Sequence, residues 1–413
     1  MSGVPSTTDV TSASGAVNAL RSTEAIRERA GALLARARAG QSAFFAMDDA
    51  ALRSAARTVA ELTRQRFADL RIPYHSRWRH FEAGQVDRRA QLDALLGPVD
   101  AAERARTQID LALVSVLLDA GAGATWRYAE AASGQTFSRS EGLGVASFHA
   151  FTAGLFSSDP SQPLRVDAAG LAVLTTETLG TAFQVSEENP LVGLDGRVDL
   201  LRRLGSAMLA HEGTYGPAGR PGALYDALQA PMLQAHDILM TLLDTLSDIW
   251  PAQNRLGGIA VGDCWPHPAV PGSGLTAGWM PFHKLSQWLT YSLLEPFEWA
   301  GVQVSGLDAL TGLPEYRNGG LLIDAGVLIP LPSHHATRTW QAGDEFIVEW
   351  RALTVALLDE IAPLVRAELG RSARQLPLAC VLEGGTWGAG RLLAQRLRGG
   401  LPPFHIASDG TVF

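Results

Sequence analysis

Apolar residues recur every three or four positions along most of this chain, and this spacing constrains its fold more than any other feature. Such spacing places apolar side chains on one face of an α-helix. A helix that begins after Asp48 and Asp49, for example, would bury a stripe made of Leu52, Ala55, Ala56, Val59 and Leu62. The same pattern predicts helices in residues 16–39, 101–118, 142–153, 199–211 and 225–246, and in a long stretch from about residue 344. We therefore expect a mainly α protein.

Signals for β-strands are sparse. Three short apolar runs are candidates, at residues 321–323, 327–329 and 378–382. Several loops are long and rich in Gly and Pro, notably residues 213–222 and 265–278. The sequence thus predicts one large helical catalytic domain over residues 16–413, with a few short strands and long Gly/Pro-rich loops. Residues 1–15, rich in Ser, Thr and Gly, are expected to form a disordered tail.

Composition narrows the class of protein. The 413 residues carry a net charge of −8, and 46% of them are hydrophobic while 18% are charged. Such a balance argues against a surface that binds nucleic acid or an anionic membrane, since both need a basic face. The two cysteines suit a reducing compartment, and the most apolar run, residues 111–118, is too short to cross a bilayer. A cytoplasmic protein that acts on a small molecule is expected.

Familiar cofactor and nucleophile motifs are absent. The sequence holds no Walker P-loop, no HExxH, no G-x-S-x-G elbow and no C-x-x-C pair. The glycines Gly121 and Gly123 follow a helical run, so they lack the strand-turn-helix setting of a dinucleotide site. We therefore expect neither a cofactor nor a bound metal.

Residues 72–84 concentrate polar groups in a short loop after a helix. Arg77 and Arg79 alternate, so on an extended segment both would point the same way and could grip a phosphate or a carboxylate. His75, His80 and Glu82 could instead bind a metal ion. A structural loop whose arginines pair with nearby carboxylates explains the segment equally well.

A second polar segment follows the apolar run that ends at Asp119. The negative end of a helix disfavours an acid, so Asp119 needs a partner, and Arg127 is a candidate. Arg139 and Glu141 come soon after, and Glu141 can be explained as a capping residue. Trp126 fits the core better than it fits a stacking platform for a base.

Pro281 is expected to open another helix. On that helix Lys284, Gln287 and Tyr291 form a polar stripe at i, i+3 and i+7. Such a polar stripe is common on a helix face that is exposed to solvent. If the helix is buried on both sides, the stripe points into a cavity, where a lysine is costly unless it has a role or a partner.

Asp324 is the strongest functional signal, because it is the one carboxylate within the apolar run of residues 319–330. An acid in such surroundings must be paired, hydrogen-bonded or shifted in pKa. The alternative is an aspartate that forms a turn before Ala325 and Gly326.

Glycine and polar residues also meet at residues 382–391. Thr386 follows two glycines and is typical of an N-cap, which predicts an anion site at a helix N-terminus. Glu383 could bind ribose hydroxyls, with Trp387 beside it. Capping alone would explain Thr386.

Taken together, these segments resemble the uracil-catabolism family of fungi and bacteria, a family long catalogued as a domain of unknown function. The resemblance covers almost the whole chain after residue 16, through segments 72–82, 119–128, 139–145, 183–191, 262–267, 382–391, 408–413 and the helix of Lys284. It implies a place in a pathway that degrades uracil through its nucleotide and eventually releases urea. It also implies a pathway partner that resembles a GTP cyclohydrolase.

A more distant resemblance is to the all-helical N-glycosylases that salvage queuosine 5′-phosphate. Their central helix end and tryptophan are similar to Asp119 and Trp126, and their lysine helix is similar to residues 282–287. Their catalytic aspartate is similar to Asp324, although the Tyr-Arg pair that follows it there is replaced here by Ala325 and Gly326.

The resemblance implies an N-glycosidase that splits a ribosylurea-type nucleotide into urea and ribose 5-phosphate. Asp324 would stabilise the cationic sugar, attack C1′ or activate water, and Lys284 or His80 would supply a proton. The substrate-binding candidates are Arg77, Arg79, Trp126, Arg139, Glu141, Gln287, Glu383, Thr386 and Trp387.

Two alternatives remain open. One is a metal-dependent amidohydrolase acting on a ureide, whose ligands would be His75, His80, Asp263 and His267. The other is a non-catalytic partner of the ring-opening enzyme.

Overall fold

The computed structural model describes residues 9–250 and 254–407. Contacts within the chain gather into two compact units, each built from separated stretches. Of the described residues, unit 1 comprises 9–74, 254–284 and 308–407, and unit 2 comprises 75–250 and 285–307. Helices dominate both units, so the expectation of a mainly α protein is confirmed.

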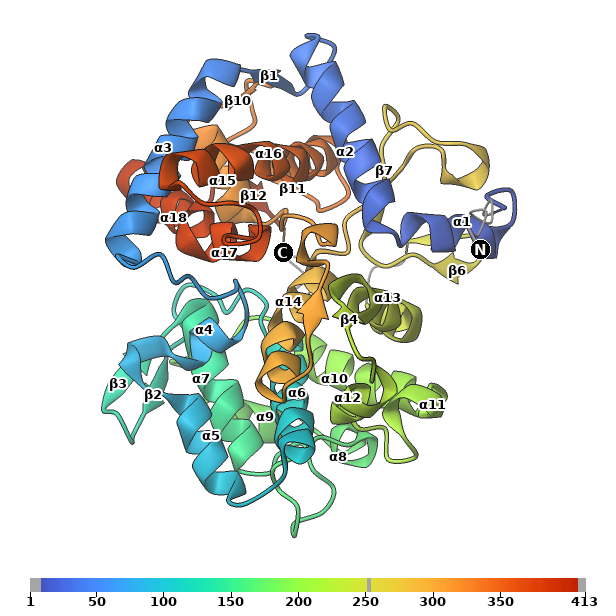
Figure 1. The fold of residues 1–413 in the computed structure, drawn as a ribbon, viewed down its shortest axis with the longest axis vertical. Helices are drawn as coiled ribbons and strands as arrows, with labels where there is room; N and C mark the ends of the chain where they lie inside the picture. The colour runs from blue at the N-terminus through green and yellow to red at the C-terminus, as the bar shows by residue number, and fades with distance from the viewer. Residues whose placement is uncertain (1–8, 251–253, 408–413) are drawn as a thin grey trace. The chain divides into compact units, whose positions relative to one another are not determined.

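Unit 1 is built around one long helix, α16 (Glu345–Leu369), most of whose residues are buried. It packs against α2 and α3, and α15 packs against α18 (Figure 1). The other helices of the unit are α1 (Ala13–Leu20), α2 (Thr23–Arg38), α3 (Asp49–Arg66), α15 (Tyr316–Asp324), α17 (Leu378–Val381) and α18 (Trp387–Arg398). The predicted stripe on α3 is buried at Leu52, Ala55, Ala56 and Val59.

The N-terminal region differs from its prediction in two ways. The predicted helix over residues 16–39 is broken after Leu20, because the Ser22 side chain accepts the Ala25 N–H and caps a new helix. Residues 1–8 of the predicted tail lie outside the described residues. The rest is ordered, since Ser12 caps α1 and the Asp9 carboxylate accepts from Thr11.

Two of the three predicted strands are wrong. Residues 321–323 lie in α15, which begins where the Glu315 carboxylate accepts the N–H groups of Arg317 and Asn318. Residues 378–381 form α17 after Pro377, and residues 382–386 continue as the π-helical turn η6. A short apolar run fits one helix face as well as it fits a strand, so periodicity alone does not separate the two. The third prediction is confirmed, because β10 (Leu328–Pro330) pairs antiparallel with β1 (Phe45–Met47).

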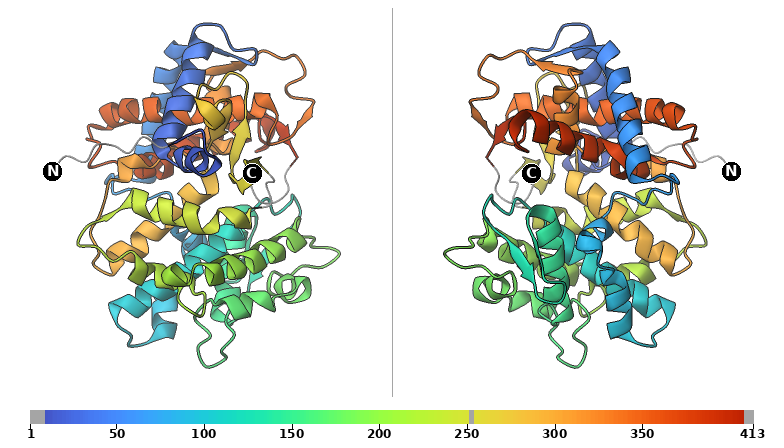
Figure 2. Two further views of the ribbon diagram at one scale, coloured as in Figure 1. Left: turned by 90° about the vertical axis from the view of Figure 1, so that its right-hand side faces the viewer. Right: turned by 90° about the vertical axis from the view of Figure 1, so that its left-hand side faces the viewer.

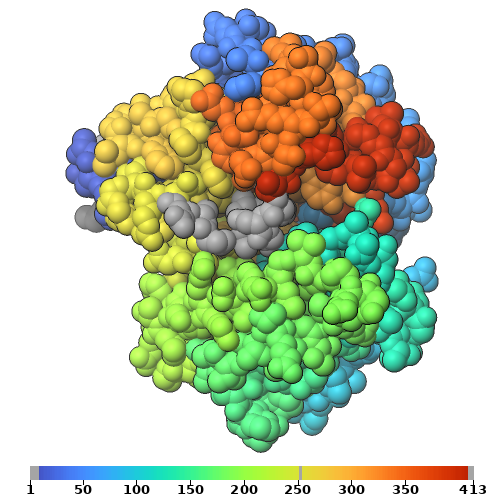
Figure 3. All heavy atoms as spheres, turned by 180° about the vertical axis from the view of Figure 1, so that it is seen from behind, coloured from blue at the N-terminus to red at the C-terminus, as the bar shows by residue number. Residues whose placement is uncertain are grey.

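Unit 2 is organised around α6 (Ala101–Leu117), whose second half is entirely buried. Its neighbours include α7 and α10 (Figure 2). The other helices are α4 (Trp78–Phe81), α5 (Arg88–Leu96), α7 (Arg139–Thr152), α8 (Ala168–Ala172), α9 (Thr176–Ala182), α10 (Leu194–Ala210), α11 (Glu212–Tyr215), α12 (Leu224–Ala227), α13 (Ala235–Leu246) and, from Leu285 onward, α14 (Lys284–Trp299). On the face drawn in Figure 3, the green segment that carries α8 to α12 forms much of the surface of this unit.

Every strand of the described residues belongs to a two-stranded pair. Besides β1 and β10, the pairs are β2 (Tyr128–Glu130) with β3 (Gln135–Phe137), β4 (Leu233–Gln234) with β9 (Val304–Ser305), β5 (Arg255–Leu256) with β6 (Ile259–Ala260), β7 (Cys264–Pro266) with β8 (Trp279–Pro281), and β11 (Thr339–Trp340) with β12 (His405–Ile406). Pro281 therefore ends β8 rather than opening a helix. Within the described ranges, no helix is both long and apolar enough to cross a membrane.

Candidate functional site

Arg77 is fully buried at the start of α4 and anchors a polar cluster in unit 2. Its Nε donates to the Ser115 hydroxyl at 2.6 Å, and its Nη1 lies 3.2 Å from the Asp119 carboxylate. Its backbone N–H donates to the Ser292 hydroxyl at 2.9 Å. The remaining nitrogen, Nη2, is buried without a hydrogen-bond partner among the described residues. This guanidinium is thus held in place, and the two N–H groups of Nη2 are left without a partner among the described residues.

The predicted convergence of Arg77 and Arg79 is wrong. Residues 78–81 form α4 rather than an extended segment, and two residues along a helix rotate a side chain by more than half a turn. Arg79 consequently pairs elsewhere, with Glu295 at 2.7 Å and Glu82 at 3.0 Å.

Asp119 finds its partner in Arg77, and not in Arg127 as the sequence predicts. Arg127 donates to the backbone carbonyls of Ala124 and Trp126 instead. The full charge of Arg77 at contact distance outweighs the unfavourable end of α6. The second carboxylate oxygen, Oδ1, is buried and has no hydrogen-bond partner within the described part of the chain.

His80 lies beside this ion pair with its Nδ1 buried and, among residues 9–250 and 254–407, without a hydrogen-bond partner. Burial, and then the neighbouring Arg77 charge, lower the pKa of His80 to about 4. Its imidazole is therefore neutral near pH 7 and able to accept a proton. The ring meets that of Trp288 edge to face, with centroids 5.8 Å apart.

We call Arg77, His80, Asp119 and Glu141 the Arg77 cluster, because Glu141 interacts electrostatically with both Arg77 and His80. Three of its members each leave a buried polar atom unsatisfied within the described residues. Native interiors rarely tolerate such atoms, since each costs about 1–3 kcal/mol, so they are characteristic of a site that receives a ligand or ordered water.

Other predicted binding residues of unit 2 lie near this cluster or in the core. Arg139 is exposed at the start of α7 and adopts a left-handed φ of 55°, a strained conformation typical of functional positions. Trp126 is completely buried, and its indole N–H donates to the Phe183 carbonyl at 3.0 Å, which makes it a core residue. Gln287 is also fully buried, on α14.

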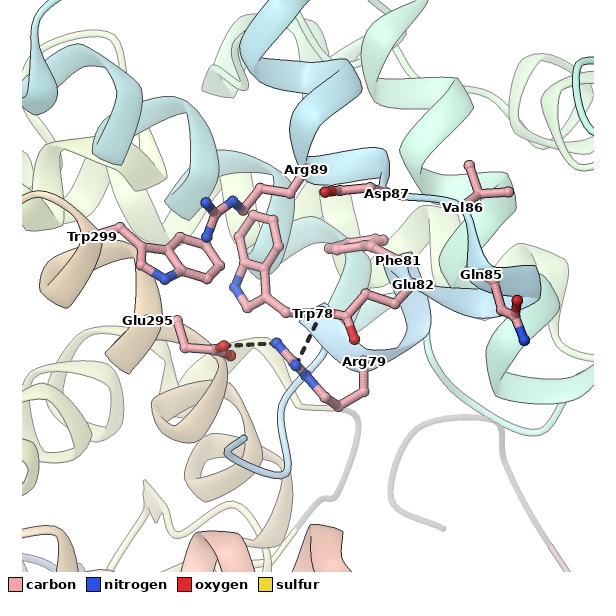
Figure 4. A pocket seen from close by; sticks show the side chains of 10 residues that line it. All are labelled: Trp78, Arg79, Phe81, Glu82, Gln85, Val86, Asp87, Arg89, Glu295 and Trp299. Carbon is pink, nitrogen blue, oxygen red and sulfur yellow. Dashed lines mark hydrogen bonds and ion pairs between the residues drawn. The ribbon is translucent and has the colours of Figure 1, made fainter. Parts of the chain in front are cut away.

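A pocket of about 530 Å³ is lined by residues of α4, of the segment that follows it and of α14 (Figure 4). Its wall carries Glu295, which accepts from Arg79 at 2.7 Å and from the Ser76 hydroxyl at 2.5 Å. Burial raises the pKa of Glu295 to about 7 despite the Arg79 charge. Arg89 lies over the Trp299 ring, 4.2 Å from its centroid. The pocket thus contains a carboxyl group that titrates near neutral pH.

The predicted residues of unit 1 form a separate set. Both oxygens of Asp324 accept from Arg398, at 2.5 and 2.7 Å, and the Asp324 side chain is 2% exposed. This ion pair satisfies the aspartate without a ligand, and a catalytic role for Asp324 stays a prediction. Lys284 begins α14, where its backbone N–H donates to the Asp263 carboxylate at 3.0 Å.

The predicted anion site at Thr386 is wrong in its geometry. Thr386 continues a helical path from η6 into α18, and its hydroxyl donates to the Asn318 side chain at 2.9 Å. The preceding glycines serve packing, because a Cβ on Gly385 would lie 2.5 Å from the Val59 carbonyl of α3. Glu383 pairs with Arg66 at 2.9 Å, and Trp387 lies 5.6 Å from the Arg391 guanidinium.

The ligand set of the metal alternative is divided between the units. His75 and His80 belong to unit 2, while Asp263 and His267 belong to unit 1. Arg351 donates hydrogen bonds to both carboxylate oxygens of Asp263, each at 2.7 Å. Among the described residues, no group of three or more His, Cys, Asp or Glu side chains is arranged to hold a metal ion.

Sequence reasoning missed Glu295 and gave Asp119 the wrong partner. In the sequence, the signal for Glu295 is a single carboxylate directly after two leucines, Leu293 and Leu294, within a stretch of helical periodicity. Asp119 was noticed, but its pairing with Arg77 spans a separation along the chain that carries no local signature.

Comparison with known proteins shows extensive similarity. The family model described as "Protein of unknown function (DUF1688)" matches residues 19–413. A protein of Schizosaccharomyces pombe, named "Protein urg3", is 42% identical over 349 residues, which cover 83% of this chain and 84% of that protein. A protein of Lachancea kluyveri, named "Uracil catabolism protein 4", is 38% identical over 377 residues, covering 83% of this chain and 85% of that protein.

Proposed function

We propose that this chain, which belongs to the DUF1688 family, acts in uracil catabolism and hydrolyses the N-ribosidic bond of a ring-opened, ribosylurea-type uridine nucleotide. The products are urea and ribose 5-phosphate. Family membership confirms the resemblance noted from the sequence. The pathway is supported by the name of the Lachancea relative, and the reaction is supported by the Arg77 cluster.

The observation that carries the reaction is the juxtaposition of Asp119 and His80. Each keeps a buried polar atom without a partner among the described residues, and Arg77 holds the aspartate in place. A fixed carboxylate stabilises a developing cation far better in a buried site than in water, because no solvent must reorganise. A neutral imidazole beside it can accept and return a proton.

These two groups support a balanced hydrolysis. The C1′–N bond breaks, its electron pair stays on the urea nitrogen, and positive charge develops on the ribose. The Asp119 carboxylate stabilises that charge while a water molecule adds to C1′. His80 takes a proton from this water and passes it to the departing nitrogen, so no proton is consumed overall.

Other predicted roles follow from the same arrangement. Arg139, which is exposed and precedes Glu141 by two residues on α7, is suited to the 5′-phosphate, since arginine binds phosphate with two parallel hydrogen bonds. The lowered pKa of His80 argues against an imidazolium that would donate the first proton. Lys284 remains the predicted alternative donor, and Asp324 the alternative carboxylate.

The test is incubation of the purified chain with 1-(5-phosphoribosyl)urea, followed by quantification of urea and ribose 5-phosphate. Asp119→Asn keeps the shape of the side chain and removes its charge. A matched control is Asp110→Asn, because Asp110 is a buried aspartate of α6 that likewise pairs with an arginine, Arg220, at 2.7 Å. Both variants should lose stability, but only Asp119→Asn should lose turnover per folded molecule, by about a hundredfold or more.

The same incubation distinguishes the alternatives. A metal-dependent amidohydrolase would release ammonia or a carbamate rather than urea. A non-catalytic partner of a GTP-cyclohydrolase-like enzyme would release nothing alone. Equal losses of turnover in the two asparagine variants would remove Asp119 from the mechanism.

A further inference from the structure

Unit 1 contains a pocket that the proposed reaction does not use. Its volume is about 600 Å³, and it lies among α1, the first turns of α2 and the loop of residues 272–276. The residues that line it include Arg29 and Thr276, which are buried, and Glu24, Glu28 and Ser273, which are exposed. The pocket is therefore lined by one buried cationic side chain, Arg29, and by two exposed acidic side chains, Glu24 and Glu28, which we call the acidic rim.

Arg29 forms no ion pair with a carboxylate of the described residues, although the charge of Glu28 acts on it. The residue is 6% exposed, and its Nε is buried without a hydrogen-bond partner among the described residues. The hydrogen bond found for its side chain is a marginal one, from Nη1 to the Ala25 carbonyl at 3.5 Å. Burial lowers the pKa of Arg29, and the nearby Glu28 charge only partly offsets this effect.

Two other buried arginines, Arg88 and Arg351, show what a paired guanidinium looks like in this chain. Arg88 donates to both oxygens of Glu130, at 2.8 and 2.6 Å, and Arg351 donates to both oxygens of Asp263. An unpaired buried charge costs several kcal/mol. Arg29 bears this cost, and the adjoining pocket has room for a ligand anion that would offset it.

The rim restricts which anion fits. Glu24 and Glu28 stand one turn apart on α2 and are both exposed. A compact dianion such as phosphate would be repelled by them, and a simple cation would leave Arg29 unmatched. A ligand with one carboxylate and one amino group satisfies both ends.

We propose that this pocket binds a small zwitterionic amino carboxylate, with its carboxylate on Arg29 and its ammonium group facing Glu24 and Glu28. The Thr276 and Ser273 side chains line the same pocket and add hydroxyl groups to it. The site is independent of the Arg77 cluster, which belongs to unit 2.

Calorimetric titration of the full chain tests this site. The probes are glycine, 4-aminobutyrate and 6-aminohexanoate, with acetate and inorganic phosphate as single-charge-sign comparators. We expect at least one amino carboxylate to bind tenfold or more tightly than acetate and phosphate. Failure of all three to bind, or acetate or phosphate binding as tightly, would overturn the proposal.

Two variants locate the binding. Arg29→Met keeps the length of the side chain without its charge, so it should abolish binding while the melting temperature stays equal or rises. A lower melting temperature with binding retained would show that Arg29 is structural. Glu24→Gln/Glu28→Gln changes only exposed groups, and it should erase the preference for amino carboxylates over acetate. An unchanged preference would contradict the assigned orientation.

Discussion

Glu295→Gln should change how stability depends on pH, and the size of the change follows from the structure. Burial raises the pKa of Glu295 from 4.5 to about 7. A carboxyl whose folded pKa is raised stabilises the fold when protonated, and this contribution is lost as pH rises from the unfolded value through the folded one. Linkage with these two values gives a loss of about 2.5 kcal/mol between pH 5 and pH 8. Glutamine cannot titrate, so the variant lacks that loss.

The assay is urea-induced unfolding followed by circular dichroism at pH 5, 6, 7 and 8. The free energy of unfolding of the wild type, minus that of Glu295→Gln, should fall by about 2.5 kcal/mol across this range. His80 and Asp110, whose pKa values are also shifted, titrate in both proteins and cancel in the difference. Glu82→Gln, which removes the more exposed partner of Arg79, is the matched control and should run parallel to the wild type. If the free energy of unfolding of Glu295→Gln also runs parallel to that of the wild type across this pH range, Glu295 does not titrate near neutral pH.

Three further predictions follow from the ion pairs and from the sequence. Asp324→Asn should lower the free energy of unfolding by about 2–3 kcal/mol, because it weakens a buried ion pair with Arg398. Turnover should stay nearly unchanged, and a hundredfold loss of turnover with unaltered stability would make Asp324 the catalytic carboxylate. Arg139→Ala should raise KM for the phosphorylated substrate more than it lowers kcat, because Arg139 is the residue proposed to bind the 5′-phosphate; an equal loss with the dephosphorylated substrate would show a structural role. The purified chain should contain no stoichiometric metal, and one zinc per chain together with activity lost to a chelator would favour the amidohydrolase.

Long amphipathic helices could be predicted from the sequence, since their apolar stripe extends over several turns. The stripe of α3 from Leu52 to Val59 is buried as expected. Short elements could not be predicted in this way, because three apolar residues, such as 321–323, fit one face of a helix as well as they fit a strand. The break between the two helices at Ser22 depends on one capping hydrogen bond, from the Ala25 N–H to the Ser22 hydroxyl. The sequence pattern on either side of it is continuously helical.

The site was predicted in its residues better than in its geometry. The sequence predicts Arg77, His80 and Glu141 as candidates from two polar segments, and the structure brings them together electrostatically. The direction of Arg77 depends on α4, a four-residue helix too short to carry a periodic signal. Its pairing with Asp119 depends on how α4 packs against α7, which in turn packs against α6, and no local pattern encodes this arrangement.

The most direct measurement of the central claim is the time course of urea release from 1-(5-phosphoribosyl)urea by the purified wild-type chain in ¹⁸O-labelled water. The account predicts one urea and one ribose 5-phosphate per substrate, with the label on the C1 oxygen of the sugar and none in the urea. Label in a carbamate or in carbon dioxide, or release of ammonia without free urea, would contradict cleavage of the N-ribosidic bond.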